Sequence, residues 1–375
     1  MNENNSRTKQ YSKQKIHLII IHLALTVVFL LIMIFSGISS SLKNTITSWS
    51  HNFYLQVGLY LSIFAGISYL IFVPLDFYED FILEHKFSLS NQTVKGWSKK
   101  MAKKAMLSFF ILLLAGEALY FSLRLSPDYW WLLATLGWIL LTVVLTKIAP
   151  ELIIPLFYKC TPLADVNVKE KLLALGKRCG IEISDVFEIK LSKDTKKANA
   201  AIAGFGKGRR ILLGDTLLNN YSNDEIEAVF AHELGHIRMF HILKILVFGA
   251  IISLVCFFIA HLLLTKAIDL FGFGYIYNIA AFPLLSLILM ITGLALMPIQ
   301  NAYMRYLEKQ ADLFALDQIQ NNESFVSAMK KLTEQNLIDP APSKLVELLM
   351  YTHPPISKRV VYASEGNHEK PILKS

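Results

Sequence analysis

Six long apolar runs constrain this chain more than any other feature of its sequence. Each run is long enough for a helix to cross the hydrocarbon core of a bilayer. A backbone inside a bilayer must satisfy its own hydrogen bonds, so such runs fold as helices. The sequence therefore predicts a mainly α-helical protein that crosses the membrane several times. The runs cover residues 16–38, 54–75, 105–123, 129–148, 242–264 and 275–299.

The composition agrees with a membrane protein, because 54% of the 375 residues are hydrophobic and only 18% are charged. A net charge of +8 could indicate nucleic-acid binding, but the basic residues cluster in loops beside the apolar runs. We therefore expect a lipid bilayer, and no nucleic acid, among the partners. Cys160, Cys179 and Cys256 have neither CxxC spacing nor an even count, which indicates reduced thiols.

Basic residues also predict the orientation in the membrane. The segment before the first run is basic. The first run itself is too long for a signal peptide and lacks a cleavage site, so we expect this run to be retained as a membrane span. The loop of residues 84–104 is rich in lysine, whereas the loop before the second run has only Lys43. Both the N-terminus and the 84–104 loop are therefore expected in the cytoplasm. Glu117, inside the third run, faces either a water-filled interior or a neighbouring helix; we favour the interior.

The stretch AVFAHELGHIRMFH at residues 228–241 predicts a metal site. His232 and His236 are four residues apart, so on a helix they lie on one face and can share an ion. Two neutral imidazoles suit Zn²⁺, and a catalytic zinc needs a third protein ligand and an open position for water. Glu233 can take a proton from that water and deliver it to a leaving amine. The alternative is a surface helix whose histidines bind nothing.

The third ligand can be sought by elimination. A metzincin would have Gly at position 239 and His at 242, where this chain has Met239 and Ile242. His241 is five residues beyond His236, which turns it off the metal-binding face of a helix. No Asp or Glu occurs between His236 and Asp269, so a thermolysin-like Glu is missing too.

Glu308 is the predicted third ligand because the last two apolar runs form a hairpin. The midpoint between His236 and Glu308 is Gly272, in the turn. Two antiparallel helices of about 54 Å, at 1.5 Å per residue, return Glu308 to the level of the histidines and leave Asp269 at the opposite end. Asp312, one turn further on, can accept a hydrogen bond from a ligand imidazole. Otherwise, both carboxylates lie on a solvated helix face.

Residues 150–240 are more polar and predict an α+β domain at the cytoplasmic face. Ser222, with Glu225 three residues on, is a capping box that starts the histidine-bearing helix. We expect a helix at 168–178, a strand at 186–191, two β-prone segments within 198–213 around the Gly-Lys-Gly of 206–208, helices at 308–321 and 324–335, and a loop at 351–359.

Six segments, in order along the chain, resemble the type I CAAX prenyl proteases, which are integral-membrane zinc metallopeptidases of the gluzincin kind. Together they are far more specific than the HELGH motif alone. They are FILEHKFSLSNQT at 81–93, APELIIPLFYKCTPL at 149–163, KANAAIAGFGKGRRILLGDTLL at 197–218, AHELGH at 231–236, LEKQADLFAL at 307–316 and THPPISKR at 352–359.

The resemblance implies one Zn²⁺ per chain and a role for each matching residue. It implies His232, His236 and Glu308 as zinc ligands, Glu233 as general base, Asp312 beside the ligands, Asn199 on a substrate-binding strand, and His353 and Arg359 near the reacting carbonyl and the substrate chain.

These implied roles are physically reasonable. An edge strand at 199–204 could bind an extended peptide through its backbone, and the small side chain of Ala200 leaves room for it. His353 could stabilise an oxyanion, and Arg359 could pair with a C-terminal carboxylate or with a carboxylate of the zinc site. The alternatives are that Asn199 is only a turn residue and that His353 belongs only to a rigid His-Pro-Pro loop.

The resemblance also implies a helical bundle that encloses a cavity. The substrate would be a peptide or prenylated protein, with a prenylated CAAX protein losing its C-terminal tripeptide. The chain departs from the family in having Ala201 where an aromatic is usual, and about six spans where eukaryotic members have seven. The nearer alternative is an HtpX-like membrane quality-control metalloprotease. A more distant one is a non-catalytic or transport chamber protein, which only Glu117 and the basic loops support.

We expect five parts in the chain. Residues 1–149 form about four spans with the basic loop, 150–240 the α+β part with the HELGH helix, 241–300 the membrane hairpin, 301–365 the C-terminal part of the peptidase domain, and 366–375 a tail. The active site would face the cytoplasm, in the endoplasmic reticulum of a eukaryote or the plasma membrane of a prokaryote.

Overall fold

The computed structural model describes residues 3–203 and 210–364. Within them, six helices are long and apolar enough to cross a membrane, as the six apolar runs predict. Four precede the polar domain and two follow it. The main helices of these six candidate spans are α1 (Glu3–Phe35), α3 (Phe53–Phe77), α5 (Val94–Leu125), α6 (Trp130–Ile148), α11 (His241–Leu270) and α12 (Phe282–Gln318).

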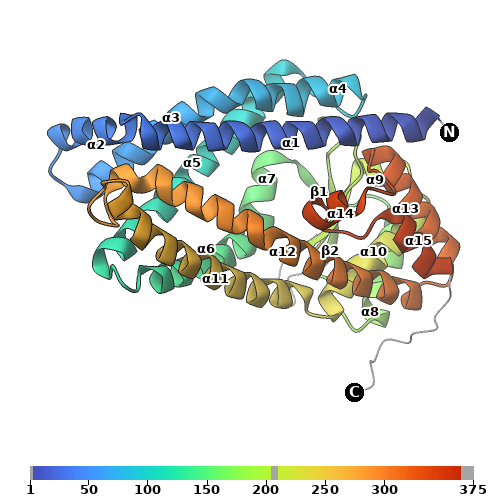
Figure 1. Ribbon diagram of the computed structural model, residues 1–375. Helices are drawn as coiled ribbons and strands as arrows, with labels where there is room; N and C mark the ends of the chain where they lie inside the picture. Colours follow the sequence, from blue (N-terminus) through green and yellow to red (C-terminus); the bar gives the residue numbers. More distant parts are fainter. Residues whose placement is uncertain (1–2, 204–209, 365–375) are drawn as a thin grey trace.

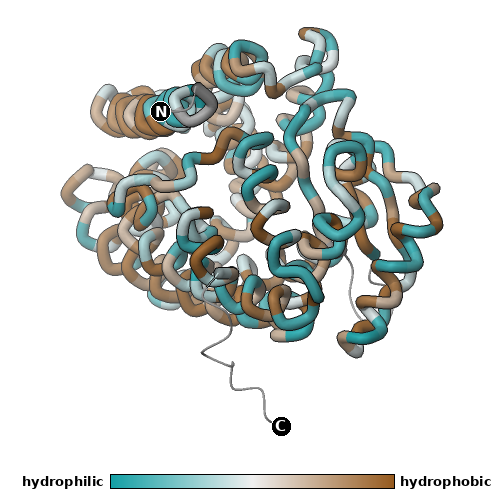
Figure 2. Tube along the Cα trace, turned by 90° about the vertical axis from the view of Figure 1, so that its right-hand side faces the viewer, coloured by the Kyte–Doolittle hydropathy of each residue, from teal (hydrophilic) through white to brown (hydrophobic). Residues whose placement is uncertain are grey.

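The long helices lie roughly side by side, and the sheet and the helices of the polar domain gather at one end of them, whereas the short helix that follows α1 lies at the opposite end (Figure 1). The N-terminus lies at the same end as the polar domain. The loop after α3 is there too, because the amide of Lys196 donates to the Leu89 carbonyl over 2.8 Å. Figure 2 views this end and shows hydrophilic segments over the polar domain, with hydrophobic ones along the membrane helices. The two segments that charge predicts on one side of the membrane therefore share an end of the molecule.

The membrane hairpin forms as predicted. Helix α11 begins at His241 and runs away from the polar domain, and α12 returns to it after a turn and a short 3-10 helix (Ile279–Ala281). Helix α12 is continuous from Phe282 to Gln318 although it contains Pro298. One helix therefore crosses the membrane and also carries Glu308 into the polar domain.

The described part of the polar domain contains a four-stranded sheet with the order β1-β2-β4-β3. Strand β2 (Asp185–Ile189) is parallel to β4 (Arg210–Gly214), and β1 (Cys160–Pro162) and β3 (Ala200–Ala203) pair antiparallel at the two edges. Strand β3 is thus the predicted edge strand, and Asn199 directly precedes it. Gly204 and the Gly-Lys-Gly of 206–208 lie outside the described residues. The three-residue β1 was not predicted.

Helix α10 (Asn223–Arg238) carries the histidine motif, and the predicted capping box starts it. The amide of Ser222 donates to Glu225 Oε2 over 2.8 Å, and the amide of Glu225 donates to Ser222 Oγ over 3.3 Å. The Glu225 carboxylate also accepts from Lys331 Nζ (2.7 Å) and Ser327 Oγ (2.6 Å), both on α13 (Asn322–Asn336). The cap therefore also ties α10 to α13.

The segment after α13 is more helical than the sequence predicts. Helix α14 (Lys344–Met350) was not predicted, and the predicted loop at 351–359 is wrong over its last residues, because α15 (Ile356–Ser364) begins there. Pro355 has no amide to donate, but its carbonyl accepts from the amides of Lys358 (2.9 Å) and Arg359 (3.2 Å). A proline pair can therefore start a helix. The predicted tail lies outside the described residues.

Glu117 lies against another helix in the described structure. Its Oε1 is 3.2 Å from the position that a Cβ would take at Gly58 of α3. This contact favours the helix–helix alternative over the interior-facing one that we preferred. An enclosed chamber within the bundle remains a prediction.

Short elements complete the described fold. They are α2 (Ile38–Trp49), a π-helical turn (Tyr78–Leu83), α4 (Glu84–Lys86), a second π-helical turn (Ala149–Ile153), α7 (Ile154–Phe157), α8 (Val166–Arg178) and α9 (Asp215–Leu218).

Candidate metal centre

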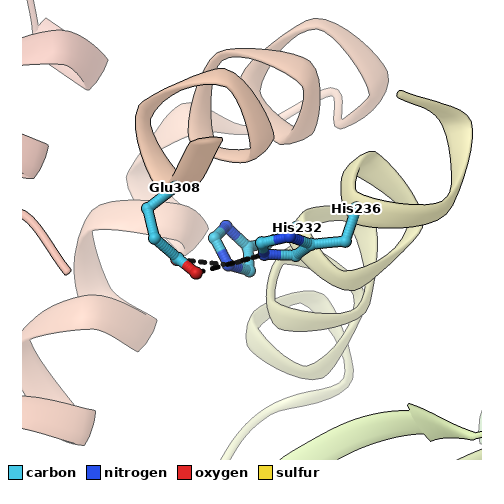
Figure 3. A group of neighbouring side chains, drawn as sticks. All are labelled: His232, His236 and Glu308. Atoms are coloured by element: carbon cyan, nitrogen blue, oxygen red, sulfur yellow. Dashed lines mark hydrogen bonds and ion pairs between the residues drawn. The ribbon is translucent and has the colours of Figure 1, made fainter. Parts of the chain in front are cut away.

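Three side chains from two helices meet at one point, as the hairpin geometry predicts. His232 and His236 project from α10 toward Glu308 of α12 (Figure 3). His232 Nε2 is 3.2 Å from Glu308 Oε2, and His236 Nε2 is 3.4 Å from Glu308 Oε1. The two Nε2 atoms are 3.2 Å apart. The midpoint argument therefore places Glu308 correctly, beside both imidazoles.

These distances fit a tetrahedral metal ion. With metal–nitrogen bonds of 2.0–2.1 Å, the edge of the tetrahedron is about 3.3 Å. The separation of 3.2 Å between the imidazole nitrogens is close to this value. Glu308 Oε2 is buried, and its 3.2 Å contact among the described residues is with His232 Nε2, so both atoms can face one ion. Two imidazoles and one carboxylate are also a donor set that suits zinc.

A buried carboxylate, that of Asp312, lies against the first imidazole. Asp312 is fully buried, and its Oδ1 is 2.9 Å from His232 Nδ1. Arg359 of α15, which is 9% exposed, donates to Asp312 through Nε (2.8 Å) and Nη2 (2.5 Å). The sequence predicts two possible partners for Arg359, a C-terminal carboxylate or a carboxylate of the site. In the structure its guanidinium contacts the second, Asp312. This contact also joins α15 to α12.

The two imidazoles have opposite electrostatic surroundings. Burial alone would lower the pKa of His232, but the carboxylates of Asp312 and Glu308 outweigh it and raise the pKa to about 9. Burial and the neighbouring His232 lower the pKa of His236 to about 3. A proton in this group of side chains is therefore held by His232 rather than by His236, and a metal ion that binds both imidazoles displaces it.

His241 supports the second imidazole, and the sequence analysis missed this role. Its Nδ1 is 3.0 Å from His236 Nδ1, and its Nε2 is 3.2 Å from Gln310 Oε1. Spacing alone turns His241 off the metal-binding face, and it is not in the ligand group. However, α10 ends at Arg238 and Phe240 takes a left-handed conformation (φ 55°), which returns fully buried His241 to His236. A hydrogen bond to Nδ1 leaves His236 Nε2 free to face the ligand group.

A cavity of about 350 Å³ opens beside His232. Its lining includes the start of the edge strand, Asn199 and Ala200, and also His353. Half-buried Glu233 also lines the cavity. His353 Nε2 is 3.3 Å from Glu308 Oε1. Four separate segments therefore meet here: Asn199, Ala200, His232, Glu233, His353 and Arg359 line the cavity, and His236, Glu308 and Asp312 contact His232.

The fold and this site together define a class of protein. A helical membrane bundle carries a domain in which a His-Glu-x-x-His helix and a distant Glu converge beside a groove. This arrangement is that of a multi-pass membrane metalloprotease.

Comparison with known proteins identifies the family. Residues 162–366 match the model of peptidase family M48, and residues 1–159 match that of the CAAX prenyl protease N-terminal region, described as five membrane helices. The chain therefore belongs to peptidase family M48. This agrees with the predicted resemblance, although residues 3–159 as described contain four candidate spans rather than five.

Individual relatives agree with this assignment over most of their lengths. The chain is 29% identical to the Bacillus subtilis metalloprotease YhfN, over 95% of this chain and 84% of that protein. It is 31% identical to the Arabidopsis thaliana CAAX prenyl protease 1 homolog, over 83% and 74%. The crystal structure of S. mikatae Ste24p superposes with a TM-score of 0.86 at 25% identity, covering 96% of this chain and 89% of that one. The alternative of a transport or non-catalytic chamber protein is not favoured.

Proposed function

We propose that this protein is a zinc endopeptidase that removes the C-terminal tripeptide of prenylated CAAX proteins at the cytoplasmic face of its membrane. The observation that carries the proposal is the ligand group of His232, His236 and Glu308, at one side of a cavity bordered by an edge strand. The names of the relatives, CAAX prenyl protease 1, support the substrate class. The membrane is the endoplasmic reticulum in a eukaryote and the plasma membrane in a prokaryote.

The substrate would bind as an added strand. Strand β3 pairs with β4 along one edge, and its other edge has no strand partner among the described residues. The Asn199 carbonyl already accepts from the Gly214 amide over 2.9 Å, so the strand is held before a substrate arrives. A peptide paired with the free edge gains backbone hydrogen bonds, and Ala200 offers it no steric obstacle.

The protein's own groups then carry the protons. A zinc ion, when bound by the three ligands, supplies Lewis-acid polarisation of the scissile carbonyl and lowers the pKa of the attacking water. Glu233 accepts the proton of that water and delivers it to the leaving amine. His353 donates a hydrogen bond to the carbonyl oxygen as negative charge develops on it. Asp312 and His241 keep the two ligand imidazoles oriented.

Glu233→Gln tests the reaction. The amide keeps the shape of the side chain but cannot accept a proton, so hydrolysis should fall by at least about 100-fold while the metal content stays at one ion per chain. The purified full chain is assayed with a farnesylated CAAX peptide and with its unprenylated counterpart. Glu227→Gln is the matched control, because Glu227 lies on the same helix but pairs with Lys171 (2.9 Å) outside the cavity.

Each outcome of this assay has a distinct meaning. Full activity of Glu233→Gln contradicts the assignment of the general base. Equal cleavage of the two peptides contradicts a prenylated substrate and favours the quality-control alternative, which uses the same chemistry. That alternative is otherwise not favoured, because the N-terminal region matches the CAAX prenyl protease model.

A further inference from the structure

Four polar residues form one stripe along α12, and only two of them belong to the metal centre. Asn301, Arg305, Glu308 and Asp312 are spaced by four, three and four residues, which places them on one face of the helix. Glu308 and Asp312 face the metal centre as described above. The other two contact a different segment, the one that leads to His353.

Asn301 and Arg305 hold the end of α14 through its backbone. Arg305 Nη1 donates to the carbonyl of Glu347 (2.9 Å) and to that of Tyr351 (2.7 Å), and Asn301 Nδ2 donates to the Leu349 carbonyl (2.7 Å). The last carbonyls of a helix lack partners within the helix, and a guanidinium there also interacts favourably with the helix dipole. Arg305 therefore fixes both the last turn of α14 and the first residue after it.

This anchoring matters because His353 is held mainly through its backbone. Its side chain is 56% exposed, and its ring contacts only Glu308 and Thr352 among the interactions described. On its C-terminal side, Pro354 and Pro355 are buried. On its N-terminal side, the carbonyl of Tyr351, two residues away, accepts from Arg305, and the Tyr351 hydroxyl donates to the Asp339 carbonyl over 3.4 Å. The direction in which the chain reaches His353 thus depends on Arg305.

We propose that Arg305 is a positioning residue that places the His353 ring at the reacting carbonyl, with Asn301 in support. One face of α12 then sets the position of both the metal ligand Glu308 and the oxyanion donor His353. The inference rests on the proposed function, because it concerns the step in which His353 acts. A donor displaced by about 1 Å can lose about 100-fold in rate, so even a small relaxation of this segment has a measurable effect.

A double-variant cycle tests the inference with full-length protein in nanodiscs. Arg305→Met keeps an unbranched stem and removes all the donors. We expect kcat to fall by about tenfold or more, with KM and metal content close to wild type. Arg305→Lys should recover part of kcat, because a single ammonium can reach one of the two carbonyls but lacks the guanidinium fork. In the His353→Ala background, Arg305→Met should cause no further loss.

Arg178→Met is the matched control for removing a guanidinium. Arg178 also donates to a backbone carbonyl, that of Gln318 (2.8 Å), but far from His353 along the chain. This variant should keep the wild-type kcat. Multiplicative losses in the double variant, or full kcat in Arg305→Met, overturn the inference.

Hydrogen–deuterium exchange provides a readout that does not need activity. In Arg305→Met, the amides of residues 347–353 should exchange faster, while those of α10 remain unchanged. If the wild type cleaves no peptide, the proposed function fails and exchange alone decides whether Arg305 fixes the segment. Unchanged exchange over 347–353 overturns the anchoring itself.

Discussion

Gly235 lies where α10 and α12 approach closely, and Gly235→Ala tests whether this contact sets the geometry of the metal centre. A Cβ at position 235 would lie 3.0 Å from the Cα of Ala311, 3.2 Å from its carbonyl oxygen and 3.2 Å from Cδ1 of Phe314. Carbon atoms pack best at about 3.5–4.0 Å. Because two of these neighbours are backbone atoms, the helices must separate by about 0.5 Å.

The expected magnitude follows from the position of the ligands. His236 is adjacent to Gly235 on α10, and Glu308 is about one turn before Ala311 on α12, so separation of the helices moves the ligands apart. Metal–ligand distances tolerate about 0.2 Å. We expect metal affinity to fall about 10- to 100-fold, as when ligand orientation is disturbed. Overpacking lowers the free energy of unfolding by about 1–3 kcal/mol. The higher helix propensity of Ala raises it by only about 1 kcal/mol.

Two measurements on the purified full chain check this prediction. Competition with a chelating dye gives the metal affinity, and the melting temperature of the metal-free protein gives the cost of overpacking. Gly249→Ala is the matched control, because a Cβ at Gly249 of α11 has no heavy atom within 4 Å among the described residues. Wild-type metal affinity together with an unchanged or raised melting temperature in Gly235→Ala would refute the reasoning.

Two further variants test the buried charges. Asp312→Ala should destabilise the fold by about 3–5 kcal/mol, because it leaves the buried Arg359 without its partner. In a thermal melt, the double variant with Arg359→Met should recover part of this loss. Equal melting temperatures of Asp312→Ala and wild type would contradict the prediction. Asp215 accepts from the hydroxyl of Ser192 (2.6 Å) and from the amides of Ser192 (2.8 Å) and Leu191 (2.9 Å), and despite its burial these bonds lower the pKa of its carboxyl. The stability that this carboxylate contributes is present above the unfolded pKa of about 3.9 and is lost as the pH falls through the lower folded value. Asp215→Asn should therefore lower the free energy of unfolding by about 1–3 kcal/mol at pH 7, and the difference from wild type should shrink below about pH 4. An equal difference in stability between variant and wild type at pH 7 and below pH 4 would contradict this prediction. Asp224→Asn is the control, because the Asp224 side chain is 62% exposed.

Features that depend on length and local chemistry were predictable from the sequence. The hairpin places Glu308 correctly because two helices of equal rise must end at the same level. The capping box at Ser222 starts α10 because its two hydrogen bonds lie within four residues. Edge strand β3 follows from a short β-prone segment beside another one. None of these needs information about contacts between distant parts of the chain.

Features that depend on distant contacts were not predictable. His241 reaches His236 because α10 ends and Phe240 takes a positive φ, and no glycine marks that break in the sequence. Glu117 lies against Gly58 of α3, a pairing of two helices that charge and hydropathy do not specify. The helix that follows Pro355 was predicted as a loop because prolines usually indicate loops. In each case, packing between segments decided between two locally acceptable conformations.

The stripe on α12 lies between these two cases. The spacing of Asn301 and Arg305 before Glu308 is visible in the sequence, and it places the three side chains on one face of a helix. What the sequence cannot give is their partner, because backbone carbonyls of α14 carry no residue signature. Since α12 also crosses the membrane, one continuous helix joins the bilayer, Glu308 and the segment of His353.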